Sequence, residues 1–232
     1  MKREYIKVPK SDPLPQYVPI LKELSDEVWK NNIFHHLLSF YKNYDYEALN
    51  HKIEQERKND TPRIEREITK FIRLNLNGDR GFGYHFRASG EETNDEEVEG
   101  NYDITIHSTN WKNGNFYFEC KNLNSRQDLI NKYVSYNKGH LIYDGGVYRY
   151  FNGKYAQSLV FGGMIGFVLE GDVLSIKSRI VEKLKERFDI APEGDLIHVI
   201  HNSIEGNEFT FDSRHKRKGA EFLLHHLLFD FS

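Results

Sequence analysis

The sequence of 232 residues predicts an α/β (α+β) fold in which a mixed central β-sheet is flanked by helices. Segments whose apolar residues recur at helical spacing alternate along the chain with short runs of strand-forming residues. Apolar residues make up 38% of the chain and aromatic residues 14%, which is enough for one well-filled core. The length is short for two large independent domains.

The first 60 residues are expected to form an N-terminal arm followed by helices. Prolines and lysines between residues 1 and 19 predict an extended arm, and the apolar spacing of residues 20–44 predicts one or two helices. Residues 60–62, Asp-Thr-Pro, form a typical helix start, because a capping residue is followed by proline in the first turn. The helix that they begin is expected to end at Gly78.

Further along, strands and helices are expected to alternate. Strands are predicted where β-branched and aromatic residues gather or where apolar and polar residues alternate, and helices where apolar residues recur every three to four positions. In chain order we expect a strand (81–89), an acidic loop (90–100), a hairpin (102–107 and 116–122), a helix (126–137), a hairpin around two glycines (140–156), a strand (164–171), a helix (173–188), two strands (195–204 and 207–213) and a closing strand or helix (221–231).

Charge and cysteine content indicate which partners and which cellular compartment suit the protein. The formal charge of -3 and the pI near 6.4 give no global basic signal, so nucleic-acid binding would need a local basic patch. The single cysteine, Cys120, excludes an intrachain disulfide and is typical of a reducing compartment. No apolar run has the length of a signal peptide or of a membrane span. We therefore expect a cytoplasmic protein without a membrane partner.

The first predicted hairpin carries charged residues on one face. Because side chains alternate across a strand, Ile104 lies on the face opposite to that of Asp103. In the second strand Phe118 likewise faces away from Glu119 and Lys121. Any register that places Ile104 beside Phe118 in the core therefore places Asp103 on the same face as Glu119 and Lys121.

Two carboxylates that meet across a strand pair repel each other, because their Cβ atoms lie about 4.5–5.5 Å apart. A bound cation would remove the repulsion, and oxygen ligands of this kind suit Mg²⁺ or Mn²⁺. Glu65 and Glu67 border the apolar stripe of the preceding helix on its two sides, so a third carboxylate can reach the site; Glu65 is the preferred candidate and Glu67 the reserve. The competing interpretation is that these charges form the solvated face of an amphipathic hairpin.

These residues resemble the PD-(D/E)xK nuclease superfamily. The resemblance is carried by TPRIEREIT with Glu65, NYDITI with Asp103, and FYFECKN with Glu119 and Lys121. It implies a restriction-endonuclease-like core built from a helix, three strands, a helix and a strand. The chain has Tyr102 where some members of the family have a proline before the first acid.

The resemblance also implies a domain organisation. Residues 1–60 form the N-terminal arm and helices, and residues 61–232 form a nuclease-like domain. Within that domain, residues 61–151 hold the core motifs and residues 152–232 are a C-terminal elaboration. We expect the whole chain to make one compact unit.

By resemblance, each motif residue has a role. Asp103, Glu119 and the backbone carbonyl of Cys120 are implied to hold the metal, which is Mg²⁺ or Mn²⁺. Lys121 is implied to orient or activate the attacking water, and Glu65 to support the metal or its waters. A divalent ion beside a lysine can neutralise the scissile phosphate and supply the nucleophile, which is what phosphodiester hydrolysis needs.

The implied function is that of a metal-dependent endonuclease acting on DNA, in the setting of a restriction or anti-phage defence effector. Its partners would be nucleic acid and either a protein partner or a second copy of the chain. One rival is a catalytically inactive nuclease-like module that binds nucleic acid or assembles a defence or repair complex. The other rival is a structural interaction protein with solvated hairpin charges. The intact set of acids and lysine favours the enzyme over both.

A run of basic residues lies near the C-terminus. The segment DSRHKRKG includes Arg214, Lys216, Arg217 and Lys218. It is either a solvated turn or a patch that contacts phosphates, and beside a nuclease core we predict nucleic-acid binding by these four side chains.

Two histidine pairs and a group of tyrosines suggest binding sites, but packing inside the protein is the simpler interpretation of each. The pairs His35-His36 and His225-His226 suggest zinc, but adjacent histidines point in different directions and no cysteine accompanies them, so packed histidines are expected. Arg149 lies among tyrosines that would stack on bases, although interleaved tyrosines in a hairpin more often serve sheet packing.

Overall fold

The computed structural model describes residues 21, 23–90, 92–93, 100–135, 145–188, 194–204 and 207–232. Within these residues, seven strands form one mixed sheet in the order β1-β4-β5-β6-β9-β8-β7, and two short strands pair separately. The strands are β1 (Arg87–Ser89), β2 (Glu92–Thr93), β3 (Asn101–Tyr102), β4 (Ile104–His107), β5 (Asn115–Leu123), β6 (Phe161–Val168), β7 (Asp195–His201), β8 (Thr210–Arg217) and β9 (Ala220–Asp230).

The sheet is mixed because its centre is parallel and its sides are antiparallel. Strands β5, β6 and β9 run parallel to one another, whereas β1-β4, β4-β5, β9-β8 and β8-β7 are antiparallel pairs. The crossover from β5 to β6 contains a helix, as a parallel connection requires. A mixed sheet flanked by helices confirms the predicted fold class.

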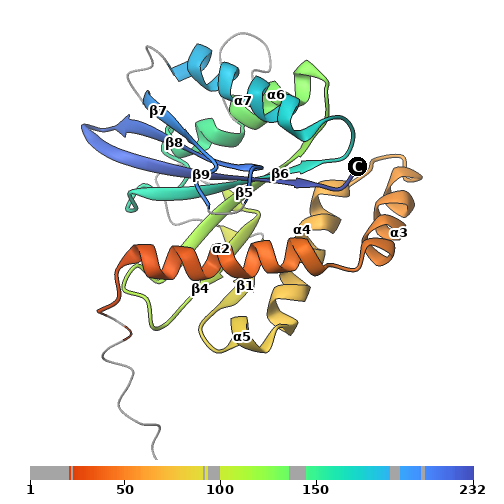
Figure 1. The fold of residues 1–232 in the computed structure, drawn as a ribbon, viewed down its shortest axis with the longest axis horizontal. Helices are drawn as coiled ribbons and strands as arrows, with labels where there is room; N and C mark the ends of the chain where they lie inside the picture. The colour runs from red at the N-terminus through yellow and green to blue at the C-terminus, as the bar shows by residue number, and fades with distance from the viewer. Residues whose placement is uncertain are drawn as a thin grey trace, which may run out of the picture.

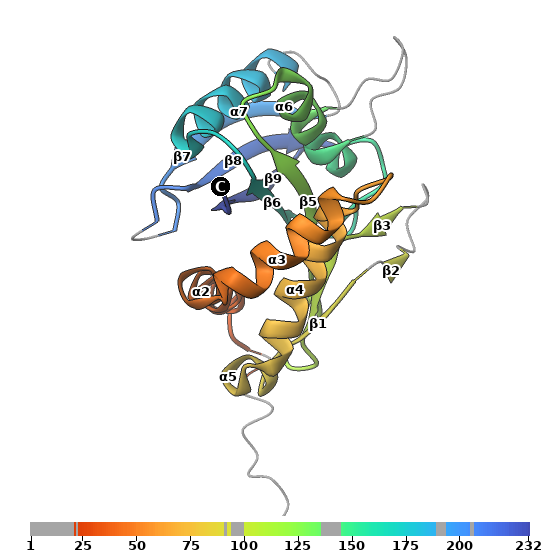
Figure 2. The same cartoon turned by 90° about the vertical axis from the view of Figure 1, so that its right-hand side faces the viewer.

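Helices cover both faces of this sheet (Figures 1 and 2). On one face lie α2 (Asp26–Asn43), α3 (Tyr46–Arg57), α4 (Ile64–Gly78) and the short α5 (Arg80–Gly83); on the other lie α6 (Gln127–Val134), α7 (Val173–Phe188) and the 3-10 helix η1 (Gly146–Tyr150). Each face has its own hydrophobic cluster, so the sheet is the middle of three layers.

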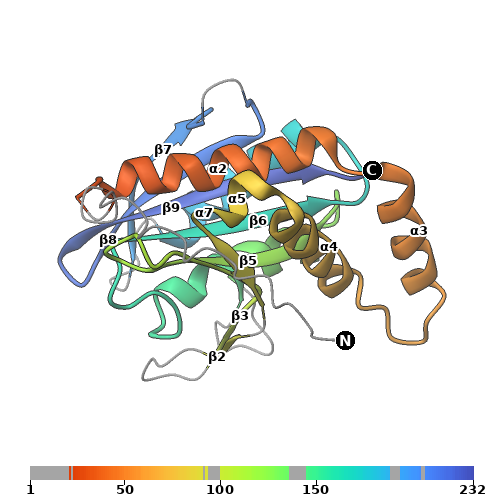
Figure 3. The same cartoon turned by 90° about the horizontal axis from the view of Figure 1, so that it is seen from below.

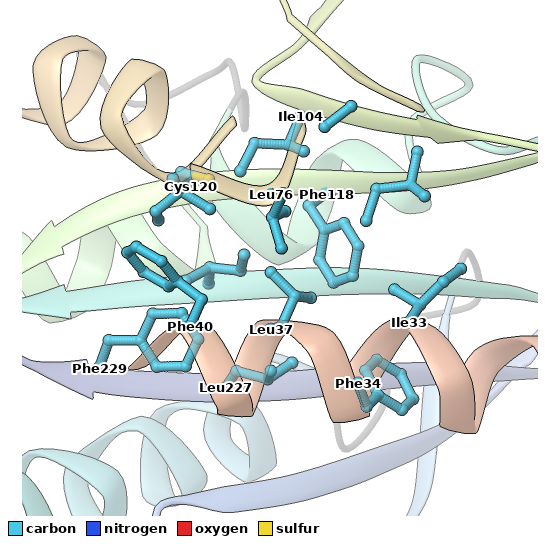
Figure 4. Packing of buried hydrophobic residues seen from close by; sticks show 14 of the residues in the cluster. Ile33, Phe34, Leu37, Phe40, Leu76, Ile104, Phe118, Cys120, Leu227 and Phe229 are labelled. Carbon is cyan, nitrogen blue, oxygen red and sulfur yellow. The ribbon is translucent and has the colours of Figure 1, made fainter. Parts of the chain in front are cut away.

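Helix α2 joins the N-terminal part of the chain to the same core as the sheet. It runs along β9 (Figure 3), where the ring of Tyr41 stacks on Phe229 at 4.6 Å between centroids. Ile33 and Leu37, four residues apart, are completely buried and point at the sheet beside Phe118 (Figure 4). Residues before and after position 60 therefore share one hydrophobic cluster.

Helix α4 is the element that carries a predicted site residue to the sheet. Ile68, Ile72 and Leu76 recur at helical spacing and are buried, so the apolar stripe predicted for this helix faces the core. The first turn of α4, with Glu65, lies at the end of the stripe. The helix begins at Ile64, so residues 60–62, which were predicted to start it, precede it; it ends at Gly78, as the sequence predicts.

Most predicted elements are present, and two predictions are wrong. The segment predicted as a strand over 81–89 begins with α5 and becomes extended only at Arg87, and the segment 145–156 forms η1 and turns in place of a hairpin strand. In the second case Gly146 has a positive φ of 47°, and a Cβ there would lie 1.7 Å from the backbone oxygen of Tyr133, so packing against α6 fixes this segment.

The closing segment is strand β9, which decides between the two predicted alternatives. The predicted N-terminal arm, most of the acidic loop and the first half of the second hairpin lie outside the described residues.

Candidate active site

The register of the hairpin places the predicted acids opposite each other. Ile104 on β4 pairs with Phe118 on β5, so Asp103, the residue before Ile104, lies opposite Glu119. Asp103 occupies a bend between β3 and β4 and does not belong to either strand. Ile104 and Ile106 of β4 lie in one core cluster with Phe116 and Phe118 of β5, which confirms the predicted parity of the two faces.

The ammonium group of Lys121 contacts all three carboxylates of the site. Its Nζ lies 2.6 Å from Glu119 Oε1, 3.2 Å from Glu65 Oε1 and 3.9 Å from Asp103 Oδ2. The side chain of Lys121 is 16% exposed, so these contacts are made largely away from solvent. The four predicted site residues therefore converge on one point.

Glu65 is the helix carboxylate that reaches the site. Its Oε1 contacts Lys121, and its Oε2 accepts a hydrogen bond of 3.1 Å from the backbone N–H of Asn122 on β5. Both oxygens of Glu65 are thus directed at the end of β5. This arrangement decides between Glu65 and the reserve candidate Glu67 in favour of the former.

The backbone of Cys120 connects an acid to the lysine. Its N–H donates to Asp103 Oδ2 at 2.7 Å, and its carbonyl oxygen accepts from Lys121 Nζ at 2.6 Å. The thiol side chain itself is completely buried in the core cluster of α2 and α4. The carbonyl predicted to be a metal ligand therefore faces the charged side of β5.

Glu119 is completely buried, and a residue that the motif analysis did not assign to the site contacts it. Its Oε1 accepts from Lys121 and from Arg149 Nη1 at 2.8 Å, whereas its Oε2 has no hydrogen-bond partner among the described residues. Arg149 also donates to the hydroxyl of Tyr155 at 2.9 Å, and that hydroxyl donates to the carbonyl of Asn101. Arg149 and Tyr155 belong to the segment that was expected to be a hairpin.

The surroundings move the pKa values of the cluster in different directions. Burial raises the pKa of Asp103 well above its usual range, and the nearby charge of Glu119 adds to the rise. Burial alone would raise the pKa of Glu119 too, but Lys121 and Arg149 outweigh it and the net shift is downward. Burial opposes the charge of Lys121, yet the three carboxylates raise its pKa. Glu119 and Lys121 therefore form an ion pair, while Asp103 is the acid that most readily keeps a proton.

The donor set suits a hard divalent cation, although the described part of the chain contains no group of side chains already arranged around a metal position. Among the described residues, no three His, Cys, Asp or Glu side chains are arranged to hold a metal ion. The chemistry of the set nevertheless fits Mg²⁺ or Mn²⁺, since it offers carboxylate oxygens and a carbonyl. The unpartnered, buried Oε2 of Glu119 is an orphan acceptor of the kind that a cation would satisfy.

The basic segment near the C-terminus is split between the two faces of β8. Lys216 and Lys218 are exposed, and Arg214 is half-buried and lies 3.5 Å from Glu221. Arg217 is buried and donates to the carbonyls of Tyr150 at 3.0 Å, Ala156 at 2.9 Å and Leu159. The prediction that Arg217 contacts nucleic acid is therefore wrong, because strand alternation turns its side chain inward.

The histidines of β8 and β9 serve packing and hydrogen bonding. A buried chain links Tyr133, His226, Ser213, His215 and the carbonyl of Gly194 through hydrogen bonds of 2.8–3.0 Å. The carbonyl can only accept, so His215 Nδ1 donates to it, Ser213 donates to His215 Nε2, His226 Nε2 donates to Ser213, and Tyr133 donates to His226 Nδ1. Every member is satisfied with both imidazoles neutral.

Comparison with protein-family models, with curated proteins and with solved structures finds no match to this chain. Within the described ranges, no helix combines the length and the apolar character needed to cross a membrane. The cytoplasmic location stays a prediction.

Proposed function

We propose that this chain is a metal-dependent nuclease of the PD-(D/E)xK type that hydrolyses phosphodiester bonds of DNA. The observation that supports it is the convergence of Glu65, Asp103, Glu119 and Lys121, which come from one helix and a strand pair. These are the motif residues that the resemblance assigns to the reaction. A restriction or anti-phage setting, with a protein partner or a second copy of the chain, is part of the same proposal.

The order of the surrounding elements also supports the proposal. From α4 onward the chain runs through α4, β1, β4, β5, α6 and β6, apart from the short elements between them. This is the sequence of helix, three strands, helix and strand that the resemblance implies. Asp103 lies in the bend just before β4 and Glu119 lies within β5, and these two strands are neighbours in the sheet.

In the proposed reaction, Asp103, Glu119, Glu65 and the carbonyl of Cys120 would hold the metal. The ion, when bound, polarises the phosphodiester and lowers the pKa of a bound water. The ammonium of Lys121, which contacts three carboxylates, stays charged and so acts as a hydrogen-bond donor that orients water and phosphate. Glu65 fixes Lys121 and the backbone at Asn122, which keeps the donor in place.

The rival functions do not all require the buried carboxylate of Glu119. A structural interaction protein has no need of a completely buried glutamate with one unpartnered oxygen, because a buried unsatisfied polar atom costs stability. The other oxygen of Glu119 is paired with Lys121 and Arg149, so a cation would satisfy the one that remains. The geometry therefore supports a cation-binding site, which a metal-dependent nuclease requires.

A cleavage assay tests the proposal. Purified protein with Mg²⁺ or Mn²⁺ should cut DNA, alone or with its activating partner, and a chelator should stop it. Asp103→Asn and Glu119→Gln preserve shape but remove charge, and each should lower the rate by at least about a hundredfold, the effect of losing a few kcal/mol of transition-state stabilisation. Asp128→Asn on the exposed side of α6 is the matched control and should cut normally.

The variants also need a fold control, which thermal melts provide. Wild type and both site variants should melt cooperatively. Equal cleavage by all four proteins under activating conditions would exclude the assigned site. DNA binding by the wild type without cleavage in either metal would favour the inactive module.

A further inference from the structure

Arg149 lies at the carboxylate site beside Lys121. Its Nη1 contacts Glu119 Oε1 at 2.8 Å, and Lys121 Nζ contacts the same oxygen at 2.6 Å. The side chain of Arg149 is 26% exposed, whereas Glu119 has no exposed surface. Arg149 is therefore partly open to solvent beside a carboxylate that is not.

Two further contacts hold the guanidinium of Arg149 in place. Its Nη1 donates to the hydroxyl of Tyr155, and its central carbon lies 5.6 Å from the centre of the Tyr155 ring. The same hydroxyl donates to the carbonyl of Asn101, two residues before Asp103. Arg149 is thus tied to Glu119 on β5 and, through Tyr155, to Asn101 on β3, so little side-chain entropy remains to be lost when it binds a ligand.

The formal charges of the site leave room for one phosphate. Among the described residues, and with Asp103 ionised as a metal ligand must be, the carboxylates of Glu65, Asp103 and Glu119 face the cations Lys121 and Arg149, which leaves one negative charge. A divalent ion changes the sum to one positive charge, and a phosphodiester with one negative charge brings it to zero. Without Arg149 the loaded site would keep an excess negative charge and would repel the transition state.

We propose that Arg149 is a catalytic residue that binds the scissile phosphate, an assignment that rests on the proposed nuclease function. A planar guanidinium can present two parallel N–H groups to phosphate oxygens, which an ammonium cannot do. Charge develops on those oxygens in the transition state, so a fixed guanidinium stabilises it without reorganisation. Lys121 then serves the water and Arg149 serves the phosphate.

The alternative role for Arg149 is purely structural, as the ion-pair partner that keeps Glu119 in the fold. The two roles differ in what happens to the metal. A phosphate-binding arginine can be removed with metal affinity kept or increased, because a positive charge beside a dication is lost. A structural arginine, once removed, lowers stability, metal affinity and turnover together.

The experiment compares Arg149→Met and Arg149→Lys with wild type and with the control Arg126→Met, whose arginine is 72% exposed on the α6 side. A fluorescent DNA duplex is titrated in Ca²⁺ over a salt series, Mn²⁺ binding is measured directly, and cleavage is followed in Mn²⁺. Arg149→Met should reduce the slope of log affinity against log salt by about 0.9 and the turnover by at least about a hundredfold. Its Mn²⁺ affinity should be unchanged or higher, and Arg126→Met should match wild type.

The Arg149→Lys variant keeps the charge and separates electrostatics from geometry. It should restore most of the salt slope but recover turnover only in part, since an ammonium cannot present two parallel N–H groups to phosphate oxygens. Turnover of both variants within about twofold of wild type, with equal salt slopes, would overturn the assignment of Arg149 and leave the nuclease intact. Parallel losses of melting temperature, Mn²⁺ binding and turnover in both variants would assign Arg149 to structure. A wild type that neither binds nor cuts DNA would overturn the nuclease proposal itself.

Discussion

Replacing Lys121 by methionine should destabilise the metal-free protein strongly. Methionine is similar in length but leaves Glu65, Asp103 and Glu119 facing one another with Arg149 as the remaining cation. Removing one partner of a buried ion pair typically costs about 3–5 kcal/mol of unfolding free energy. For a chain of this length 1 kcal/mol corresponds to about 2–4 °C, so we expect the melting temperature to fall by about 6–20 °C.

The same variant should gain more from a divalent cation than the wild type does. Without the ammonium the site carries a formal charge of two negatives in place of one, so Mg²⁺ is attracted more strongly and has no cation to displace from Glu119 Oε1. At a concentration about a hundred times the dissociation constant, binding to the folded state adds about 2.7 kcal/mol of unfolding free energy. Lys121→Met should therefore recover much of its lost stability in Mg²⁺ while remaining inactive.

The assay is a thermal melt in chelator, in KCl of matched ionic strength and in MgCl₂. Lys177→Met is the matched control, because Lys177 is also buried but its ammonium donates to neutral oxygens of Asn202, Glu208 and Thr210. That control should lose stability and gain nothing extra from Mg²⁺. A metal-free melting temperature for Lys121→Met within about 2 °C of wild type would refute the reasoning, as would equal Mg²⁺ gains in all three proteins.

Three further outcomes follow from other parts of the structure. Burial lowers the pKa of His215 to about 4 and that of His226 well below its usual range, so below about pH 6.5 the unfolded chain binds more protons than the folded protein does. The unfolding free energy should be full above that pH and should fall as the pH drops toward 4, by about 1.4 kcal/mol per pH unit for each histidine. A urea midpoint that rises between about pH 7 and 5 would contradict this. Arg217→Met should lower the unfolding free energy by about 3 kcal/mol, because three carbonyls each lose a hydrogen bond from a charged donor, and an unchanged urea midpoint would remove that role. Lys216→Ala and Lys218→Ala should leave the midpoint unchanged but each flatten the salt slope of DNA binding by about 0.9, and an unaltered slope would assign both to a solvated turn.

The charged face of the hairpin could be predicted because strand geometry allows few choices. Side chains alternate with a period of two, so burying Ile104 beside Phe118 fixes the face of Asp103, Glu119 and Lys121 in any register. The apolar stripe of α4 limited the helix carboxylate to Glu65 or Glu67, which border it on its two sides. Only the contacts of Glu65 with Lys121 and Asn122 decide between them.

The contribution of Arg149 could not be predicted, because its segment is shaped by distant contacts. Tyrosines alternating with other residues predict strands, whereas the chain forms a 3-10 helix where Gly146 fits against the backbone of Tyr133. Arg217 was predicted wrongly because a dense run of basic residues suggested a patch that contacts phosphates. Positions 214–217 lie within β8, where every second side chain points into the protein.

Cys120 contributes to the hydrophobic core with its side chain and to the candidate site with its backbone. Its side chain belongs to the core cluster that also contains Leu37 and Phe118 (Figure 4), while its two backbone groups hold Asp103 and Lys121. A larger residue at position 120 would need space in the core, and any shift of the backbone that provides this space would move both charged groups. A substitution that improves packing at position 120 would therefore also change the geometry of the site. We expect the amino acid at this position to change more slowly in evolution than those at core positions of α7, whose neighbours are not charged residues of the site.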